Sequence, residues 1–238
     1  MSRLDTNNNV LKETWMKLKT KLLSSVLLFA LPVMANAEVS GYVTLTSDYM
    51  FRGLSLNDKD PAIQAGLDWS AEDSGWYAGI WASPVTDDTE VDLFVGYAGE
   101  LADGLEYDLM AVYYAYLDED EYNYMELHAG LSKALSSNFS LGINLDYTND
   151  SLGSSAYEDM NALHMSVVAS FSIQEDLSLE LEYGRQGWEE YGEDEDYDWG
   201  RLSVLKDYGD FSFDVSAWYN DLDGDDSSKF TVGVSYNF

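Results

Sequence analysis

The sequence predicts an all-β protein: a single antiparallel up-and-down transmembrane β-barrel of about 12 strands. Three observations favour this fold. After residue 37, apolar and polar residues alternate with a period of two along most of the chain, which is typical of strands whose two faces meet different surroundings. The connections between these segments are alternately short and long. A basic and then apolar segment near the start of the chain resembles the signal of an exported protein.

Residues 1–37 are predicted to be an N-terminal extension followed by a cleaved secretory signal peptide. A lysine-rich segment is followed by the apolar stretch 22–34 and by a small-x-small site that ends at Ala37. This order predicts cleavage between Ala37 and Glu38, with Met16 as a candidate start of translation. The apolar stretch is too short for a spanning helix, which needs roughly 20 residues. Residues 38–238 are then the barrel.

The composition excludes several classes of protein. The 238 residues carry a net charge of −32, yet 46% of them are hydrophobic, so the chain is too apolar to be a disordered acidic protein. The negative charge argues against a nucleic-acid partner. The chain has no Cys, which excludes a disulfide framework and thiolate metal sites. After the leader no apolar run is long enough for a membrane helix, whereas barrel strands need only alternate residues to be apolar.

Each strand is predicted from the same alternation. In the segment 139–149, Phe139, Leu141 and Ile143 share one face, and polar residues occupy the other. Most of the segments reach the roughly 9–11 residues that a tilted membrane strand needs. The predicted strands are 39–52, 61–71, 75–84, 90–101, 105–117, 122–135, 139–149, 159–173, 177–186, 196–208, 210–220 and 229–238.

The connections predict which rim faces which side of the membrane. Short turns are expected at 72–75, 102–104, 136–138, 174–176 and 208–210. Longer, acidic loops are expected at 53–60, 84–90, 118–121, 150–158, 187–196 and 221–228. Short periplasmic turns with longer extracellular loops are typical of outer-membrane barrels. A soluble β-sandwich, the alternative fold, gives no reason for this regular alternation.

Aromatic residues near strand ends give weaker support. Tyr49, Trp76, Tyr124, Trp199 and Tyr219 are expected to belong to interfacial girdles, where amphipathic rings lie at the headgroup level. The chain ends on an alternating strand whose last residue is Phe238. A terminal strand of this kind is expected to serve as the assembly signal. The expected partners are therefore the outer-membrane assembly machinery, outer-membrane lipid and lipopolysaccharide.

Three short motifs resemble a known family. They are SDYMFRG at 47–53, PAIQ at 61–64 and GWY at 75–77, and the terminal GVSYNF also fits. Together they resemble the opening of the TorF-type family of proteobacterial outer-membrane porins, formerly a family of unknown function. The resemblance covers about a fifth of the predicted mature chain. It implies an outer-membrane barrel that conducts small solutes, and it implies no catalytic residues.

Strand parity predicts an acidic interior. Eleven acidic residues, two arginines and both histidines are expected on the inner face, and the arginines are expected to pair with neighbouring carboxylates. Such a lumen would attract cations. The candidate pore-lining residues are Asp48, Arg52, Asp68, Asp92, Glu100, Glu106, Asp108, Glu126, His128, Asp146, His164, Glu180, Glu182, Arg201 and Asp214.

The expected function is passive diffusion of small solutes, cations or neutral molecules, through a narrow lumen in the Gram-negative outer membrane. Two alternatives remain open. One is a closed structural or adhesive barrel whose acidic loops bind ions or surfaces. The other is an outer-membrane hydrolase, although neither histidine has a nucleophile motif nearby. No cofactor is implied, and the acidic segments 189–198 and 221–226 leave Ca²⁺ binding open. The solute and the oligomeric state are not predicted.

Overall fold

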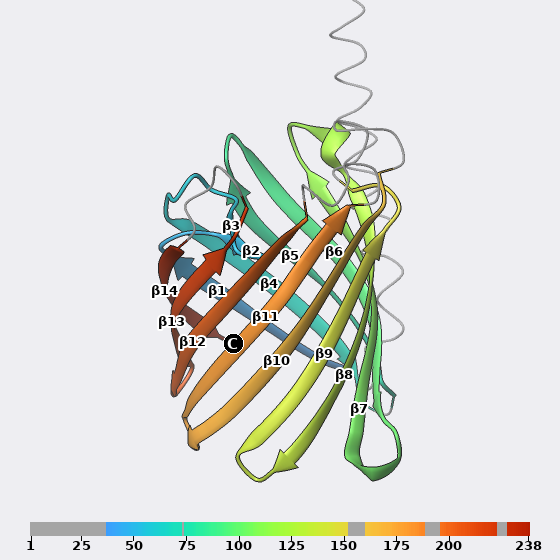
Figure 1. Ribbon diagram of the computed structural model, residues 1–238, viewed down its shortest axis with the longest axis vertical. Coiled ribbons are helices and arrows are strands. Elements are labelled where there is room, and N and C mark those ends of the chain that lie inside the picture. Colours follow the sequence, from blue (N-terminus) through green and yellow to red (C-terminus); the bar gives the residue numbers. More distant parts are fainter. Residues whose placement is uncertain (1–36, 73, 152–159, 189–195, 223–227) are drawn as a thin grey trace, which may run out of the picture. The chain divides into compact units, whose positions relative to one another are not determined.

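Twelve strands form one closed antiparallel barrel, in which β1 pairs with β14 (Figure 1). The computed structural model describes residues 37–238 except 73, 152–159, 189–195 and 223–227. The predicted twelve-strand barrel is confirmed. The predicted extension and signal peptide lie outside the described residues up to residue 36, and β1 begins beside the predicted cleavage site. No helix in the described part of the chain is long and apolar enough to cross a membrane.

The strands run in chain order around the barrel. Each pairs with its neighbours in sequence, as in an up-and-down meander. Their bounds are β1 Ala37–Thr46, β4 Ala62–Ala71, β5 Trp76–Val85, β6 Asp88–Glu100, β7 Leu105–Tyr116, β8 Tyr124–Ser136, β9 Phe139–Thr148, β10 Ala162–Gln174, β11 Leu177–Trp188, β12 Tyr197–Tyr208, β13 Phe211–Asn220 and β14 Ser228–Asn237. Two short 3₁₀ turns, Ala102–Gly104 and Asp120–Tyr122, lie between strands.

The wall has an apolar outer face and a polar inner face. Large apolar side chains such as Leu93 and Ile143 are about half exposed on the outside. Ser83, Ser203 and Ser216 are almost completely buried, and the hydroxyls of Ser203 and Ser216 bond each other at 2.6 Å across neighbouring strands. This distribution is the reverse of a soluble core, and it suits a barrel surrounded by hydrocarbon.

The two rims differ in the length of their connections, as predicted. The short turns lie at the lower end of the view in Figure 1; one of them, at 209–210, joins β12 to β13. One prediction at the other rim is wrong. The connection predicted at 84–90 shrinks to the two residues between β5 and β6, because pairing continues as far as Val85 and Asp88. Asp87 completes this tight turn with a φ of 62°.

The predicted first strand, 39–52, is also wrong in its second half. β1 ends at Thr46, and the chain then forms a small hairpin of β2 (Met50–Phe51) and β3 (Leu54–Ser55). Arg52 and Gly53 make its turn with φ values of 48° and 82°. Positive φ at both central residues is the type I′ geometry that tight hairpins favour. We call residues 48–55 the inner hairpin, because its contacts lie inside the barrel.

Candidate functional site

The tip of the inner hairpin reaches the barrel wall through Arg52. Its Nη2 donates to Oε1 of Glu126 on β8 at 2.7 Å and lies 3.6 Å from Oδ2 of Asp146 on β9. Its Nη1 donates to Oε1 of Gln186 on β11 at 3.1 Å. Burial alone would lower the pKa of Arg52, but the carboxylates of Glu126 and Asp146 outweigh burial and hold the pKa above its ordinary value. The guanidinium therefore stays charged.

The rest of the inner hairpin is held by two other parts of the wall. The Tyr49 hydroxyl donates to Oε1 of Glu90 on β6 at 2.8 Å, and the Tyr49 ring packs against Trp81 on β5. The Gly53 carbonyl accepts from Nδ2 of Asn220 on β13 at 2.9 Å and from Nζ of Lys229 on β14 at 3.4 Å. Contacts with seven strands around the barrel show that the inner hairpin crosses the lumen.

A buried clamp of two histidines lies next to Arg52. Oδ1 of Asp146 is 2.6 Å from Nδ1 of His128, and Oδ2 of Asp146 is 2.7 Å from Nδ1 of His164. Nε1 of Trp199 donates to Nε2 of His164 at 3.2 Å. Because Nε2 accepts, Nδ1 of His164 carries the proton and donates to Asp146. The clamp joins β8, β9, β10 and β12 at one level of the barrel.

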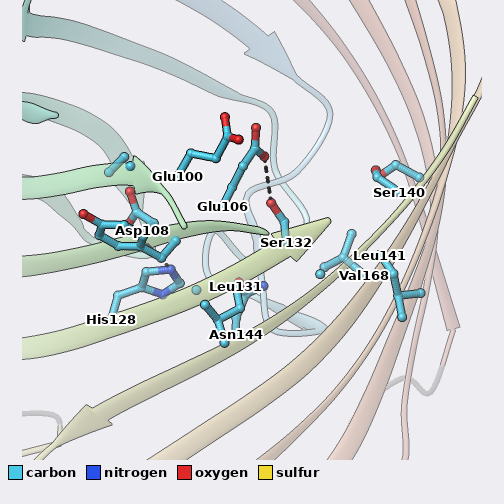
Figure 2. Close-up of a pocket in the computed structure, with 16 residues that line it drawn as sticks. Glu100, Glu106, Asp108, His128, Leu131, Ser132, Ser140, Leu141, Asn144 and Val168 are labelled. Atoms are coloured by element: carbon cyan, nitrogen blue, oxygen red, sulfur yellow. Dashed lines mark hydrogen bonds and ion pairs between the residues drawn. The ribbon is translucent and has the colours of Figure 1, made fainter. Parts of the chain in front are cut away.

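A cavity of about 610 Å³ opens on the inner wall toward the short-turn rim. Figure 2 shows Glu100, Glu106, Asp108 and His128 projecting toward the same space. Oε2 of Glu106 accepts from the Ser132 hydroxyl at 3.0 Å. A smaller cavity of about 160 Å³ is lined by the inner hairpin and by wall residues near the other rim. We call the larger cavity the vestibule.

The structure places the predicted strand residues on the inner side of the wall. The carboxylate of Asp68 on β4 covers Gly79, its partner on β5. Asp108 accepts from the Tyr77 hydroxyl at 2.8 Å. Asp214 accepts from the Ser216 hydroxyl at 3.0 and 2.9 Å. Asp92 is 9% exposed on β6. Asp48 and Arg52 also lie inside, but on the inner hairpin rather than on the first strand. Their shared role in lining a pore remains a prediction.

The expected pairing of both arginines with carboxylates is confirmed. Arg52 pairs with Glu126, as described above. Arg201 on β12 pairs with Glu180 and Glu182 on β11, and its guanidinium lies 5.4 Å from the centre of the Trp218 ring. These pairs form two charged clusters, one at the inner hairpin and one along β11 to β13.

The girdle prediction is wrong for three of the aromatic residues named for it. Tyr49, Tyr124 and Trp199 are each less than a tenth exposed and point inward. Trp76 and Tyr219 are about half exposed on the outer face, where a girdle requires them. The alternation along each strand would have identified the rings that point inward. Tyr124, for example, is two residues from Glu126 and therefore shares its inner face.

Sequence reasoning missed three polar residues that hold the inner hairpin: Glu90, Gln186 and Lys229. Glu90 and Asp92 are two residues apart and share a face, but the predicted loop 84–90 included Glu90. Lys229 begins the predicted strand 229–238, and the structure places it on β14 with only 8% of it exposed. Its neighbour Phe230 is 80% exposed, so the alternation between inner and outer side chains already holds at the start of β14.

The chain end closes the barrel. The Phe238 main chain exchanges two hydrogen bonds with Gly41 of β1, at 2.8 and 2.9 Å. The ring stacks near Tyr236 and is 64% exposed. The predicted Ca²⁺ segments, 189–198 and 221–226, fall mostly outside the described residues.

The comparison with protein families identifies the group to which the chain belongs. The family described as "Bacterial protein of unknown function (Gcw_chp)" matches residues 33–237. The chain belongs to this family. The family description does not carry the name of the TorF-type porins, so that resemblance remains a prediction. No curated protein matches the chain in sequence.

Several solved structures share the barrel fold at low sequence identity. The NanC porin is 14% identical, with a TM-score of 0.57, covering 84% of this chain and 99% of its own. The KdgM porin is 8% identical, with a TM-score of 0.60 and the same coverage. An outer-membrane channel from Pseudomonas putida F1 is 11% identical, with a TM-score of 0.53, covering 86% of this chain and 96% of its own. At these identities the likeness shows the fold.

Proposed function

We propose that this protein is a channel of the Gram-negative outer membrane, through which small cations or neutral solutes diffuse past the inner hairpin. Its short turns would face the periplasm. The observation that carries the proposal is the polar, acidic interior of a closed barrel whose outer face is apolar. The solved barrels of similar fold include porins and an outer-membrane channel, which supports the same function.

The inner hairpin would set the rate and selectivity of diffusion. It crosses the lumen, and the vestibule leads toward it from the short-turn side. The vestibule carries Glu100, Glu106 and Asp108, so cations would concentrate there and anions would be repelled. Arg52 and its carboxylate partners would then present both signs of charge to a solute at the level of the inner hairpin. No cofactor or chemical step is needed for diffusion.

Single-channel recording tests the proposal. The full chain, expressed with its own leader and purified from outer membranes, is inserted into planar bilayers under a KCl gradient. We expect discrete conductance steps and a reversal potential of the sign that cation selectivity gives. The intact mass of the purified protein also tests cleavage after Ala37. A folded barrel that inserts but shows no steps would contradict channel function.

A closed barrel is the second candidate, and the inner hairpin itself favours it. Its contacts reach both the β5–β6 wall and the β13–β14 wall, so it fills much of the lumen. A static hairpin would leave a structural barrel whose long acidic loops contact ions, lipopolysaccharide or other surfaces. The same recordings distinguish the two functions, since a closed barrel stays silent even when Arg52 is replaced.

A further inference from the structure

One carboxylate of the inner wall lacks the partners that its burial requires. Asp92 lies on the inner face of β6 and is 9% exposed. Among the residues that the structure describes, none donates a hydrogen bond to its Oδ1 atom. An ionised carboxylate in such a place is costly unless a positive charge or hydrogen-bond donors compensate it. Asp92 therefore needs a proton or a cation.

Aromatic rings flank this carboxylate on both sides. In the strand register, Asp92 lies opposite Trp81 of β5 and Tyr114 of β7. The Trp81 ring packs against Tyr49 of the inner hairpin, with ring centres 5.2 Å apart. The Tyr114 hydroxyl donates to Glu126 at 3.2 Å and is thereby directed away from Asp92. Faces of Trp and Tyr rings attract cations and repel anions.

The adjacent charges strengthen the need for a cation. Glu90 lies two residues from Asp92 on the same face, is 1% exposed and accepts from the neutral hydroxyl of Tyr49. Arg52 directs its ion pairs to Glu126 and Asp146, on β8 and β9. Two neighbouring carboxylates of β6 thus lie against aromatic rings, beside the hairpin that narrows the lumen.

We propose that Asp92 binds a small monovalent cation inside the lumen, with K⁺ as the representative ion, and that this site sets the cation preference of the channel. The second half of the inference rests on the proposed function. A divalent ion fits less well, because protein sites for Ca²⁺ gather several carboxylate ligands to balance its two charges. In the described ranges, no group of three acidic, histidine or cysteine side chains is arranged to hold a metal ion. One unpartnered carboxylate oxygen beside two aromatic residues matches the single charge of K⁺.

Binding is measured first, without conduction. The purified full-chain barrel in detergent is held at constant ionic strength in N-methylglucamine chloride, and K⁺ replaces that cation stepwise. Tryptophan fluorescence, to which Trp81 contributes along with the other tryptophans, gives one readout, and the midpoint of thermal unfolding gives a second. We expect a saturable response to K⁺. In Asp92→Asn the apparent K⁺ affinity should fall about tenfold or more, the loss of one charge contact.

The control is a carboxylate of the same wall whose oxygens are already bonded. Asp214→Asn removes one negative charge from the lumen, but both oxygens of Asp214 accept from Ser216. Its K⁺ affinity should stay within about twofold of the wild type, because distant charges are screened. If Asp92→Asn does not fold, Asp92→Glu provides the test, since moving the carboxylate by one methylene must shift the K⁺ affinity.

Three outcomes overturn the site: no response that distinguishes K⁺ from N-methylglucamine, equal K⁺ affinity in the Asp92 variant, or a response to pH alone, which would mean that a proton is bound. Bilayer recordings separate this failure from failure of the channel. K⁺ binding without conductance contradicts the channel and leaves the site standing. A selective conductance unchanged in Asp92→Asn contradicts the role of the site in cation preference and leaves the channel standing.

Discussion

Nη2 of Arg52 lies 2.7 Å from Oε1 of Glu126, and this ion pair fixes the tip of the inner hairpin to β8 inside the barrel. Both side chains are almost fully buried, at 10% and 5% exposure. Breaking such a pair leaves an uncompensated buried charge, which is far more costly than losing an exposed pair. The inner hairpin therefore depends on Arg52 more than on any contact at the surface.

Replacing Arg52 by Gln tests this dependence. We expect the free energy of unfolding to fall by about 3 kcal/mol, because Glu126 loses its charged partner. Single-channel conductance should rise as the inner hairpin loosens. Arg185→Gln is the matched control: Arg185 is 48% exposed and pairs with Asp196 and Asp198, so its loss should cost less than about 1 kcal/mol. Equal effects of the two variants on conductance would contradict the role given to the inner hairpin.

Tyr49→Phe tests the second attachment of the inner hairpin. The change removes the hydroxyl that Glu90 accepts at 2.8 Å but keeps the ring that packs against Trp81. Leaving Glu90 without this donor should cost about 1–3 kcal/mol. Denaturant unfolding measures the stability, and the open-channel noise should increase. Tyr219→Phe, at a half-exposed outer position, should leave both quantities as in the wild type.

The pH dependence of stability should contain a contribution from Asp48. Burial raises the pKa of Asp48 above its usual 3.8, and the hydrogen bond from Ser55 offsets only part of this. When the pKa of a carboxyl group is higher in the folded state than in the unfolded state, its protonation favours folding. This contribution is fully present at a pH below the unfolded-state pKa, and it is lost as the pH rises through the folded-state pKa. Asp48→Asn should therefore lose less stability than the wild type between pH about 4 and 7.

The comparison needs a variant that removes a carboxylate from the same segment without removing a buried one. Asp58→Asn does this at an exposed position beyond the inner hairpin. Urea unfolding of the three proteins at pH about 4 and about 7 measures how the free energy of unfolding changes with pH, which is the slope to be compared. If Asp48→Asn and Asp58→Asn change the slope equally, the effect comes from net charge and not from burial of Asp48.

Alternation along the strands predicted their polar inner and apolar outer faces, and the regular alternation of short and long connections favoured a barrel over a sandwich. Phe139, Leu141 and Ile143 face outward, as their spacing requires. The inner hairpin could not be predicted in this way. Tyr49 and Phe51 continue the alternation of the first strand, and the tertiary contacts of Arg52 favour the turn at Arg52–Gly53 over a longer strand. Sequence spacing also gives no sign of which carboxylates meet Arg52 across the lumen.

Gly184→Ala tests how closely the Trp199 ring approaches the wall. A Cβ at Gly184 would lie 2.5 Å from Nε1 of Trp199 and 2.9 Å from Nε2 of His164. The added methyl group should displace the ring, break the bond from Trp199 to His164 and cost about 1–3 kcal/mol. Gly233→Ala is the control on the inner face of β14, where the nearest atoms lie 3.9 Å away. Equal stability of the two variants would show that Trp199 moves aside without cost.

Phe238 closes the barrel and is predicted to serve as the assembly signal, and substitution can separate the two. Its main chain closes the barrel through two hydrogen bonds with Gly41, and its ring is mostly exposed, as a recognised assembly signal would be. Phe238→Ala keeps the backbone, so refolding in detergent should match the wild type, while the amount of barrel in the outer membrane should fall severalfold. Deleting Phe238 also removes the two hydrogen bonds, each worth about 1 kcal/mol, and should lower refolding as well. Heat-modifiable migration on gels measures the folded fraction in both settings. Normal outer-membrane levels of Phe238→Ala would contradict the assembly role and leave the ring without a function in export.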